Sequence, residues 1–406
     1  MQALEIKKDV FWVGAVDYAS RDFHGYSLSP QGTTYNCYVI KDEKNVLFDT
    51  VKHEYMGTML CRLAKVVRPE DIDYIIVNHV ELDHAGALPR AIELCKPEKV
   101  FCSPMGLTAI KSHFGGECES WPLEVVKSGD SISIGKRSVH FLETRMLHWP
   151  DSMFSYIPED KLLISNDAFG QNIASSERFA DEVNREVLNH AMTEYYHNIV
   201  LPYSPQVLKV LGQVGEMGLD IDMIAPDHGL IFRGKDDVAY ALDSYRRFAE
   251  QKPQKRALIV YDTMWHSTQK MAYSIAEGLN SVGVPSRIMD MKDNHHSAVM
   301  TELARCGLVI VGSPTHNNGI LPFVSAMLTY MKGLRPQNRI GGAFGSFGWS
   351  GECVKIISEA LQGMGFELPV DPVKVKYIPG HDNLAACHAM GKALGEALVA
   401  KCDARQ

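Results

Sequence analysis

A short segment of the N-terminal half concentrates side chains that can bind a metal. The apolar run Tyr74–Val77 predicts a buried strand. Directly after it come His79, Glu81, Asp83 and His84, which offer imidazole and carboxylate groups within six residues. Such a mixture of nitrogen and hard oxygen donors suits iron better than a thiolate site does. The segment therefore predicts part of a metal centre.

Three further candidate ligands, His148, Asp167 and His228, each lie shortly after a predicted apolar strand. These strands are expected at Val139–Leu142, Leu162–Ile164 and Met223–Ala225. Ligands at several strand ends can converge on one edge of a sheet, where the rigid strands fix their geometry. A lone histidine after a strand is more often structural or solvated, but this combination favours a dinuclear site. Other histidines without such spacing are expected to stay off the metal: His113, His197, His295, His296 and His388.

The C-terminal half contains a hydroxyl-rich segment between a predicted strand, Ala257–Tyr261, and a predicted helix, Thr268–Leu279. Its residues are Thr263, Met264, Trp265, His266, Ser267 and Thr268. Hydroxyl groups and the free N–H groups of a helix start form an anion site. The segment has neither the G-x-x-x-x-G-K-[ST] pattern of a triphosphate loop nor a dinucleotide G-x-G-x-x-G pattern. A single phosphate monoester fits, although simple helix capping would also explain the hydroxyls.

Two later segments favour a ligand-binding site over simple helix capping. Each of them follows a predicted strand, Leu308–Val311 or Gly342–Phe344. The first comprises Ser313, Pro314, Thr315, His316, Asn317, Asn318 and Gly319. The second comprises Ser346, Phe347, Gly348, Trp349, Ser350 and Gly351. Glycines allow close backbone approach to a flat ring, and Trp349 or Trp265 can stack on it. Together the three segments predict a site for a planar ligand with one phosphate.

The elements that position these groups fall into two halves. The polar, proline-containing segment Glu250–Arg256 is the expected boundary, giving domains of residues 1–250 and 254–402. After it, strands alternate with helices, with later strands at Arg287–Met289 and Val373–Tyr377, which predicts a parallel sheet covered on both faces. About 150 residues and about five strands suit a doubly wound domain that binds its ligand at the carboxyl ends of its strands.

The first half contains many short apolar runs and fewer helices, for example Ala87–Cys95 and Arg185–Tyr196. Further strands are expected at Phe11–Val16, Tyr35–Ile40, Val46–Phe48 and Val100–Cys102. This pattern predicts a sandwich of two sheets with helices outside. A barrel remains an alternative on these signals alone.

The motif His79-x-Glu81-x-Asp83-His84 resembles the metal loop of the β-lactamase-like fold, whose zinc hydrolases carry H-x-H-x-D-H. Glutamate at the second position, together with three flavodoxin-like loops, makes the chain similar to the flavodiiron proteins over essentially its whole length. This resemblance implies an α/β plus α+β fold class. The N-terminal part would be a metallo-β-lactamase-like αβ/βα sandwich, and the C-terminal part a flavodoxin-like doubly wound parallel sheet.

The resemblance also implies the cofactors, FMN and two iron ions. His79, Glu81 and His148 would hold one iron, and Asp83, His84 and His228 the other, with Asp167 bridging. Some members of the family leave the residue at the position of His84 off the metal, so both possibilities stay open for it. By the same analogy His24, Trp149 and Tyr195 are expected to line the substrate pocket.

The function implied is an oxidoreductase that passes electrons from a rubredoxin-type donor through FMN to the diiron site. There dioxygen would be reduced to water, or nitric oxide to nitrous oxide. The chain ends at Gln406, soon after the flavodoxin-like part, so we expect the two-domain class without a fused rubredoxin. Family members form head-to-tail homodimers, and we expect a homodimer or a larger assembly here.

Composition sets outer limits. The 406 residues, 46% hydrophobic and 22% charged, suit a globular protein of about two or three domains. The net charge of −8 argues against nucleic acid, which needs a basic face. No apolar run approaches the roughly 18 residues of a membrane span, and the N-terminus lacks the pattern of a signal peptide. We therefore expect a cytoplasmic protein.

The nine cysteines include no C-x-x-C pair, which excludes a cysteine-ligated zinc or rubredoxin site. They are expected to be free, buried thiols.

Two other functions remain as hypotheses. A zinc hydrolase with an appended flavodoxin would need a metal-bound hydroxide, and Glu81 in place of histidine argues against it. A plain electron carrier with a purely structural metal is the second alternative.

Overall fold

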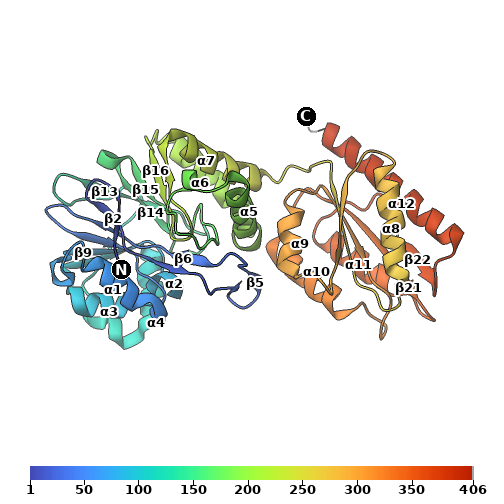
Figure 1. Ribbon diagram of the computed structural model, residues 1–406, viewed down its shortest axis with the longest axis horizontal. Helices are drawn as coiled ribbons and strands as arrows, with labels where there is room; N and C mark the ends of the chain where they lie inside the picture. The colour runs from blue at the N-terminus through green and yellow to red at the C-terminus, as the bar shows by residue number, and fades with distance from the viewer. Residues whose placement is uncertain (405–406) are drawn as a thin grey trace. The chain divides into compact units, whose positions relative to one another are not determined.

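The computed structural model describes residues 1–404, and the chain separates into two compact units (Figure 1). The first unit comprises Met1–Gly25, Ser29–Tyr196 and Tyr203–Ala249. The second comprises Tyr26–Leu28, His197–Pro202 and the chain from Glu250 onward.

The first unit is built on two large sheets. The 7-stranded sheet has the order β1-β2-β7-β8-β9-β10-β11, and the 6-stranded sheet has the order β12-β13-β14-β15-β16-β17. The strands of the first sheet are β1 (Leu4–Lys7), β2 (Val10–Trp12), β7 (Tyr38–Ile40), β8 (Val46–Phe48), β9 (Tyr74–Val77), β10 (Lys99–Cys102) and β11 (Leu123–Val125). Those of the second are β12 (Ser131–Ser133), β13 (Ser138–Glu143), β14 (Met153–Ile157), β15 (Leu162–Ile164), β16 (Met223–Ala225) and β17 (Phe232–Arg233).

Two apolar clusters define the layers of this unit. One joins residues of both sheets, such as Tyr38, Ile76, Phe141 and Leu162, so the sheets pack face to face. The other lies between the 7-stranded sheet and the helices α1 (Met56–Leu63), α3 (Leu88–Cys95) and α4 (Pro104–Phe114). The prediction of a two-sheet sandwich is confirmed, and the barrel alternative is wrong.

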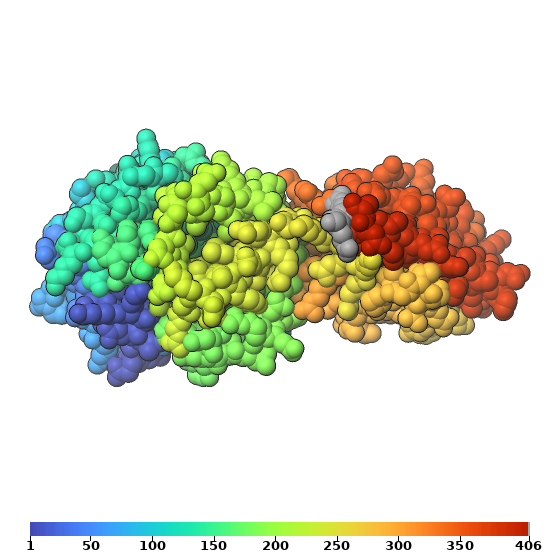
Figure 2. Space-filling model, turned by 90° about the horizontal axis from the view of Figure 1, so that it is seen from above, coloured from blue at the N-terminus to red at the C-terminus, as the bar shows by residue number. Residues whose placement is uncertain are grey.

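Three longer helices accompany the 6-stranded sheet. They are α5 (Arg185–Tyr195), α6 (Ser204–Glu216) and α7 (Gly234–Glu250), and they lie beside β14, β15 and β16 (Figure 1). On the face drawn in Figure 2, α6 and α7 form much of the outer surface of the first unit. The helix α5 continues into a π-helical turn at Tyr196–Val200.

Two predicted strands are each broken in the structure. Phe11–Val16 was expected as one strand, and so was Tyr35–Ile40, but each divides into two. The additional strands are β3 (Ala15–Asp17) and β6 (Thr33–Tyr35), which pair in a separate 2-stranded sheet. At the break, a Cβ atom on Gly14 would lie only 2.3 Å from the Tyr35 carbonyl oxygen. The two backbones thus approach so closely that glycine is required, and the chain leaves the large sheet there. Two further short strands are β4 (Asp22–Phe23) and β5 (Ser27–Leu28).

The second unit holds a 5-stranded sheet of order β19-β18-β20-β21-β22 in which every neighbouring pair is parallel. Its strands are β18 (Ala257–Tyr261), β19 (Ser286–Asp290), β20 (Leu308–Gly312), β21 (Ile340–Phe347) and β22 (Val373–Lys376). Its helices are α8 (Ser267–Asn280), α9 (His296–Leu303), α10 (Pro322–Leu334), α11 (Cys353–Gly363) and α12 (His381–Asp403). This strand order is that of a flavodoxin-like doubly wound sheet, as predicted.

Strand direction brings the candidate ligands to one edge of the first unit. β13 and β15 are both antiparallel to β14, while β15 and β16 are parallel, so all three have their carboxyl ends at the same edge. The segments that follow these three strands carry His148, Asp167 and His228.

Candidate functional site

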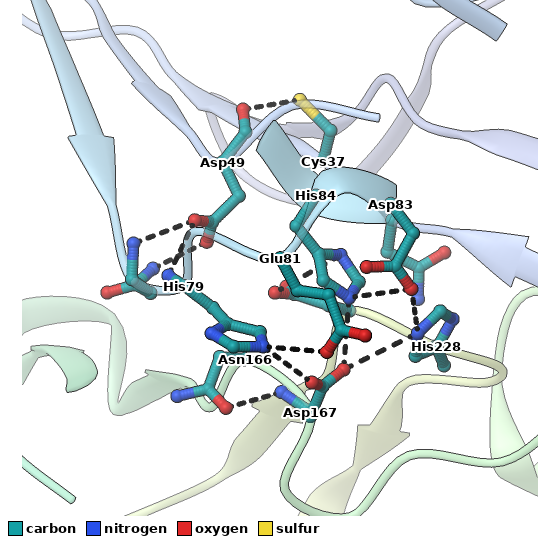
Figure 3. Close-up of polar contacts among 12 residues, drawn as sticks. Cys37, Asp49, His79, Glu81, Asp83, His84, Asn166, Asp167 and His228 are labelled. Atoms are coloured by element: carbon teal, nitrogen blue, oxygen red, sulfur yellow. Dashed lines mark hydrogen bonds and ion pairs between the residues drawn. The ribbon is translucent and has the colours of Figure 1, made fainter. Parts of the chain in front are cut away.

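The loop after β9 is held in place by the buried carboxylate of Asp49. Its oxygens accept hydrogen bonds from the backbone N–H and the side-chain amide of Asn78, both at 2.7 Å, and from the backbone N–H of His79. The loop then enters the short helix α2 (Leu82–Ala85), with Glu81 as its N-cap residue. This geometry turns the alternating side chains of the motif toward the interior (Figure 3).

A first group of potential ligands consists of His79, Glu81, His148 and Asp167, whose donor atoms lie within 4.8 Å of one another. The Oδ2 atom of Asp167 is 3.0 Å from Nε2 of His148 and 3.3 Å from Nε2 of His79. The Oε2 atom of Glu81 is 3.3 Å from the same nitrogen of His79. Two imidazoles and two carboxylates thus enclose one point.

A second group, Asp83, His84 and His228, also lies within 4.8 Å. The Oδ2 atom of Asp83 is 3.2 Å from Nε2 of His228. The other oxygen of Asp167, Oδ1, faces this group, at 3.0 Å from Nε2 of His84 and 3.4 Å from Nε2 of His228. Asp167 therefore lies between the two groups and turns one oxygen to each, as Figure 3 shows. The structure brings together every ligand candidate that the sequence predicts.

The polar atoms of these residues are not fully hydrogen-bonded to one another, and a pair of metal ions would satisfy them. His84 Nε2, Asp167 Oδ1 and Asp83 Oδ1 are buried and have no hydrogen-bond partner among residues 1–404. His84 Nε2 and Asp167 Oδ1 are only 3.0 Å apart, but the geometry of this contact is not that of a hydrogen bond. Buried polar atoms without partners are costly, and cations between the two groups would satisfy them. The donor set of imidazoles and carboxylates suits iron.

The charges of the site depend on one another. Burial by itself raises the pKa of Asp167, but His84, His148 and His79 outweigh it and hold that pKa well below its usual value. Burial likewise opposes the charged form of His84, whose pKa is nevertheless raised by Asp83 and Asp167. The carboxylates are therefore ionised in the interior and need positive charge close by, which protons on histidine or metal ions can supply.

The far sides of the imidazoles are fixed by hydrogen bonds. Nδ1 of His79 lies 3.0 Å from Oδ2 of Asp151, and Nδ1 of His228 lies 2.6 Å from the carbonyl oxygen of Thr34. With Nδ1 engaged in this way, Nε2 of both rings is left for the centre. For His84 the corresponding neighbour, Oδ2 of Asp227, is more distant, at 3.7 Å.

Sequence reasoning missed these supporting residues. Asn78, Asn166 and Asp227 each directly precede a ligand candidate, and all are buried. Asn166 accepts the backbone N–H of Asp167 and donates to the carbonyl of Met153, which anchors that turn. The recurrence of an Asn or Asp directly before three of the seven ligand candidates was the available signal. Asp151 gave none, because its partner is distant in sequence.

The three residues expected around the substrate pocket all lie beside the centre. His24, in the loop after β4, places Nε2 at 2.7 Å from Oε1 of Glu81. Burial lowers the pKa of His24, but the hydrogen bond to Glu81 and the charges of Glu81, Asp83 and Asp167 together outweigh it, so the pKa is raised overall. The ring of Trp149 lies 5.3 Å from that of His79, and the ring of Tyr195 lies 5.8 Å from that of His228.

The second unit has a cleft of about 840 Å³ at the carboxyl ends of its strands. All three predicted loops contribute to its lining, through Thr263, Met264, Trp265, Ser267, Pro314, Thr315, Asn317, Asn318, Ser346, Phe347, Gly348, Trp349 and Ser350. Tyr377 and Ile378, after β22, also line it and were missed. The available signal was that Tyr377 ends the predicted strand Val373–Tyr377 and Ile378 follows it, at a carboxyl end where the ligand was expected. The hydroxyl oxygen of Thr263 is buried without a hydrogen-bond partner in the described chain, as expected of a group that awaits a ligand.

Several predicted contact residues do not line this cleft. Thr268 and Ser313 are buried, and their hydroxyls are bonded to Ser346 and to the backbone of Pro314. His266 has a φ of 62° at the start of α8, a left-handed conformation that favours glycine, and its side chain bonds to Gln269. His316, Gly319 and Gly351 are likewise outside the lining.

The cysteines are free, as expected, and all are buried except Cys61, which is exposed. Within residues 1–404, no helix combines the length and apolar character needed to cross a membrane.

Comparisons with known proteins agree with both halves of this description. Residues 33–229 match the family model "ODP family beta lactamase", and residues 259–391 match the family model "Flavodoxin". The chain is 55% identical to a rubredoxin-oxygen oxidoreductase of Megalodesulfovibrio gigas, with 100% of each chain covered. It is 41% identical to a nitric oxide reductase of Moorella thermoacetica, covering 97% of this chain and 98% of that protein.

The fold of a solved structure is also similar to that of this chain. The flavodiiron protein from Giardia intestinalis superimposes with a TM-score of 0.95 at 33% identity, over 99% of this chain and 98% of that one. Such similarity over the whole length, together with the two ligand groups and the cleft, leaves one assignment: the chain belongs to the flavodiiron protein family.

Proposed function

We propose that this chain is an oxidoreductase that takes electrons from a rubredoxin-type donor through FMN and reduces dioxygen to water, nitric oxide to nitrous oxide, or both. When bound, FMN would supply conversion between two-electron and one-electron transfer, and the iron pair would supply the redox chemistry for a diatomic gas. The observation that carries the proposal is the position of Asp167 between two ligand groups, in a chain that also has a flavodoxin-type cleft. The relatives named for oxygen and nitric oxide reduction support both substrates.

For the metal centre we propose that His79, Glu81 and His148 hold one iron. Asp83, His84 and His228 hold the other, and Asp167 bridges. The three carboxylates offset much of the charge of the two ions, so that oxidised iron is tolerated in a buried site. Asp151 and the carbonyl of Thr34 orient His79 and His228 from behind.

Residues around the centre shape the approach of the substrate. His24 donates to Glu81 when protonated, which holds that carboxylate in position and leaves a proton at Nε2 beside the pocket. Trp149 and Tyr195 provide aromatic walls, and Tyr195 is almost fully buried, so bulk water is kept from this side. A small apolar gas enters such a pocket more easily than an ion does.

For FMN we propose that Thr263, Ser267 and the N–H groups at the start of α8 hold the phosphate. Trp265 and Trp349 are then placed to stack on the ring system, and Asn317 and Asn318 offer polar groups to its edge. The unpartnered hydroxyl of Thr263 and the shared lining of the cleft support this arrangement.

We further propose a head-to-tail homodimer, in which the flavin of one copy lies beside the irons of its partner. Trp265, Trp349, Tyr377 and Ile378 are all more than half exposed at the cleft, and a second copy would cover this apolar rim. Analytical ultracentrifugation combined with turnover measurements tests this proposal. A monomer that keeps full activity on dilution contradicts it.

We also propose residues 1–250 and 254–402 as the two folding domains, to be tested by limited proteolysis, and the cytoplasm as the location.

The deciding experiment for the function is anaerobic. The purified protein is reduced through a rubredoxin, supplied with dioxygen or nitric oxide separately, and the rates and products are compared. Rapid consumption of at least one gas is expected. Near-stoichiometric zinc in protein made without added zinc, with no gas consumed, would instead support a hydrolase. If the Asp83→Ala and His148→Ala variants stay folded and still consume either gas, the metal is structural and the chain is an electron carrier.

A further inference from the structure

The first unit has a cavity of its own, which is lined by two arginines and shares no residue with the metal centre. It has a volume of about 530 Å³, and its lining includes Arg62 on α1, Arg178, Trp12 and the N-terminal residues 1–4. Thr58, Ser175 and Ser176 add hydroxyl groups, and Tyr18 and Tyr55 add phenol rings. All of these residues belong to the first unit.

The two guanidinium groups share one aromatic neighbour. The Arg62 guanidinium carbon lies 4.5 Å from the Trp12 ring centre, and that of Arg178 lies 4.9 Å from it. Trp12 is 96% buried, so its ring is a fixed platform for both. Arginine stays charged in proteins, so two positive charges are held close together around this ring.

Arg178 is the less satisfied of the pair. Only 6% of it is exposed, and neither Nη1 nor Nη2 has a hydrogen-bond partner within the described chain, residues 1–404. Burial opposes its charge, Arg62 adds repulsion, and the pKa of the group is lowered. A buried charge without partners is strongly unfavourable unless another group neutralises it.

Among residues 1–404, the carboxylate of Glu177 attracts Arg178, but it forms no hydrogen bond with Nη1 or Nη2 and does not offset the effect of burial on the pKa. Arg62 donates to the backbone carbonyls of Gln2 and Gly14, which are neutral acceptors. Glu177 directly precedes Arg178, but its Oε2 atom accepts the hydroxyls of Ser175 and Ser176, and its pKa is lowered by those bonds. The cavity thus combines two arginine charges, the hydroxyl of Thr58 and an aromatic wall.

We propose that this cavity binds a small oxyanion, the phosphate or carboxylate group of a ligand whose organic part fits against Trp12. Paired arginines match the planar, two-oxygen face of such groups, and the bonds they form are charge-assisted. The hydroxyl of Thr58 is placed at the same cavity to complete the contacts. The anion would supply the partner that the terminal nitrogens of Arg178 lack.

The test uses the protein loaded with FMN and iron, so that the flavin phosphate site is already filled. Inorganic phosphate, methyl phosphate and acetate are titrated separately by calorimetry at constant ionic strength. At least one is expected to bind at a single site, with an affinity reduced on the order of tenfold or more in Arg62→Gln. Comparing the phosphates with acetate tells which kind of oxyanion the cavity takes. Arg90→Gln, an exposed arginine of the same unit that pairs with Glu93, is the matched control and should bind as the wild type does.

Two further variants keep the test decisive. Arg178→Lys retains the charge but loses the planar fork, so its binding should also weaken, and Arg62→Gln decides alone if that variant does not fold. Binding that survives both arginine changes but disappears in His148→Ala belongs to the metal centre and overturns the proposal. It is equally overturned if none of the three anions binds at millimolar concentration, or if Arg62→Gln only weakens association between copies of the chain.

Discussion

Asp151 supports His79 from the side opposite the metal centre. Its Oδ2 atom lies 3.0 Å from Nδ1 of His79 and also accepts the backbone N–H of Val80 at 2.7 Å. One carboxylate oxygen thus fixes both the ring and the loop that carries it. Burial raises the pKa of Asp151, but the adjacent His79 outweighs it, so that this carboxylate stays ionised.

This relationship predicts the effect of Asp151→Asn on metal binding. The amide keeps the shape but removes the charge that orients the imidazole, so metal affinity should fall by roughly tenfold to a hundredfold. Competition with a chelator, followed by metal analysis, measures it. Asp243→Asn, at an exposed position on α7, serves as the control. Unchanged retention of both ions in Asp151→Asn would contradict the prediction.

Because Asp167 lies between the two ligand groups, we expect its replacement to cause a larger loss of metal ions than replacement of a residue of one group. Because its two oxygens each lie 3.0 Å from a histidine of a different group, Asp167→Ala should lose most of both ions. His228→Ala removes a ligand from one group only and should lose mainly one ion. The metal-to-protein ratio of the two purified variants is the measurement. Equal ratios in the two variants would show that Asp167 does not bridge.

The exposed ring of Trp349 predicts a contribution to flavin affinity. Trp349 lines the cleft and is 89% exposed there, so Trp349→Ala should leave the fold intact. Loss of aromatic stacking should weaken FMN binding roughly twofold to tenfold. Quenching of flavin fluorescence on titration into apoprotein measures it. Phe323→Ala, an exposed aromatic outside the lining, should bind FMN as the wild type does.

The buried carboxyl group of Glu194 is expected to make the free energy of unfolding depend on pH. Burial raises the pKa of its carboxyl group to about 7, above the usual 4.5. The folded state then holds the proton more tightly than the unfolded state does, so the free energy of unfolding falls as pH rises from about 4.5 to about 7. The decline amounts to at most about 3 kcal/mol.

Glu194→Gln cannot ionise and should lack this decline. Its stability relative to the wild type should therefore increase between pH 5 and pH 8, as urea unfolding followed by circular dichroism would record. Glu186→Gln, near the exposed start of the same helix, is the control. A constant difference between Glu194→Gln and the wild type at both pH values would contradict the assignment.

The sequence by itself identified the ligand candidates and the three loops that line the cleft. His79, Glu81, Asp83 and His84 follow one strand at a fixed spacing, and local spacing survives folding because the chain between the residues is short. The parallel sheet of the second unit was predictable for a similar reason, since its strands are buried on both faces and appear as continuous apolar runs.

Only the tertiary structure decided the features that depend on distant segments. The break at Gly14 exists because the Tyr35 backbone lies against it, and Asp151 reaches His79 across 72 residues. Tyr377 and Ile378 join the cleft because β22 pairs beside β21. Arg178 and Arg62 meet at Trp12 only in the folded chain. Local sequence patterns carry no record of such contacts, because their geometry is set by how the sheets and loops pack.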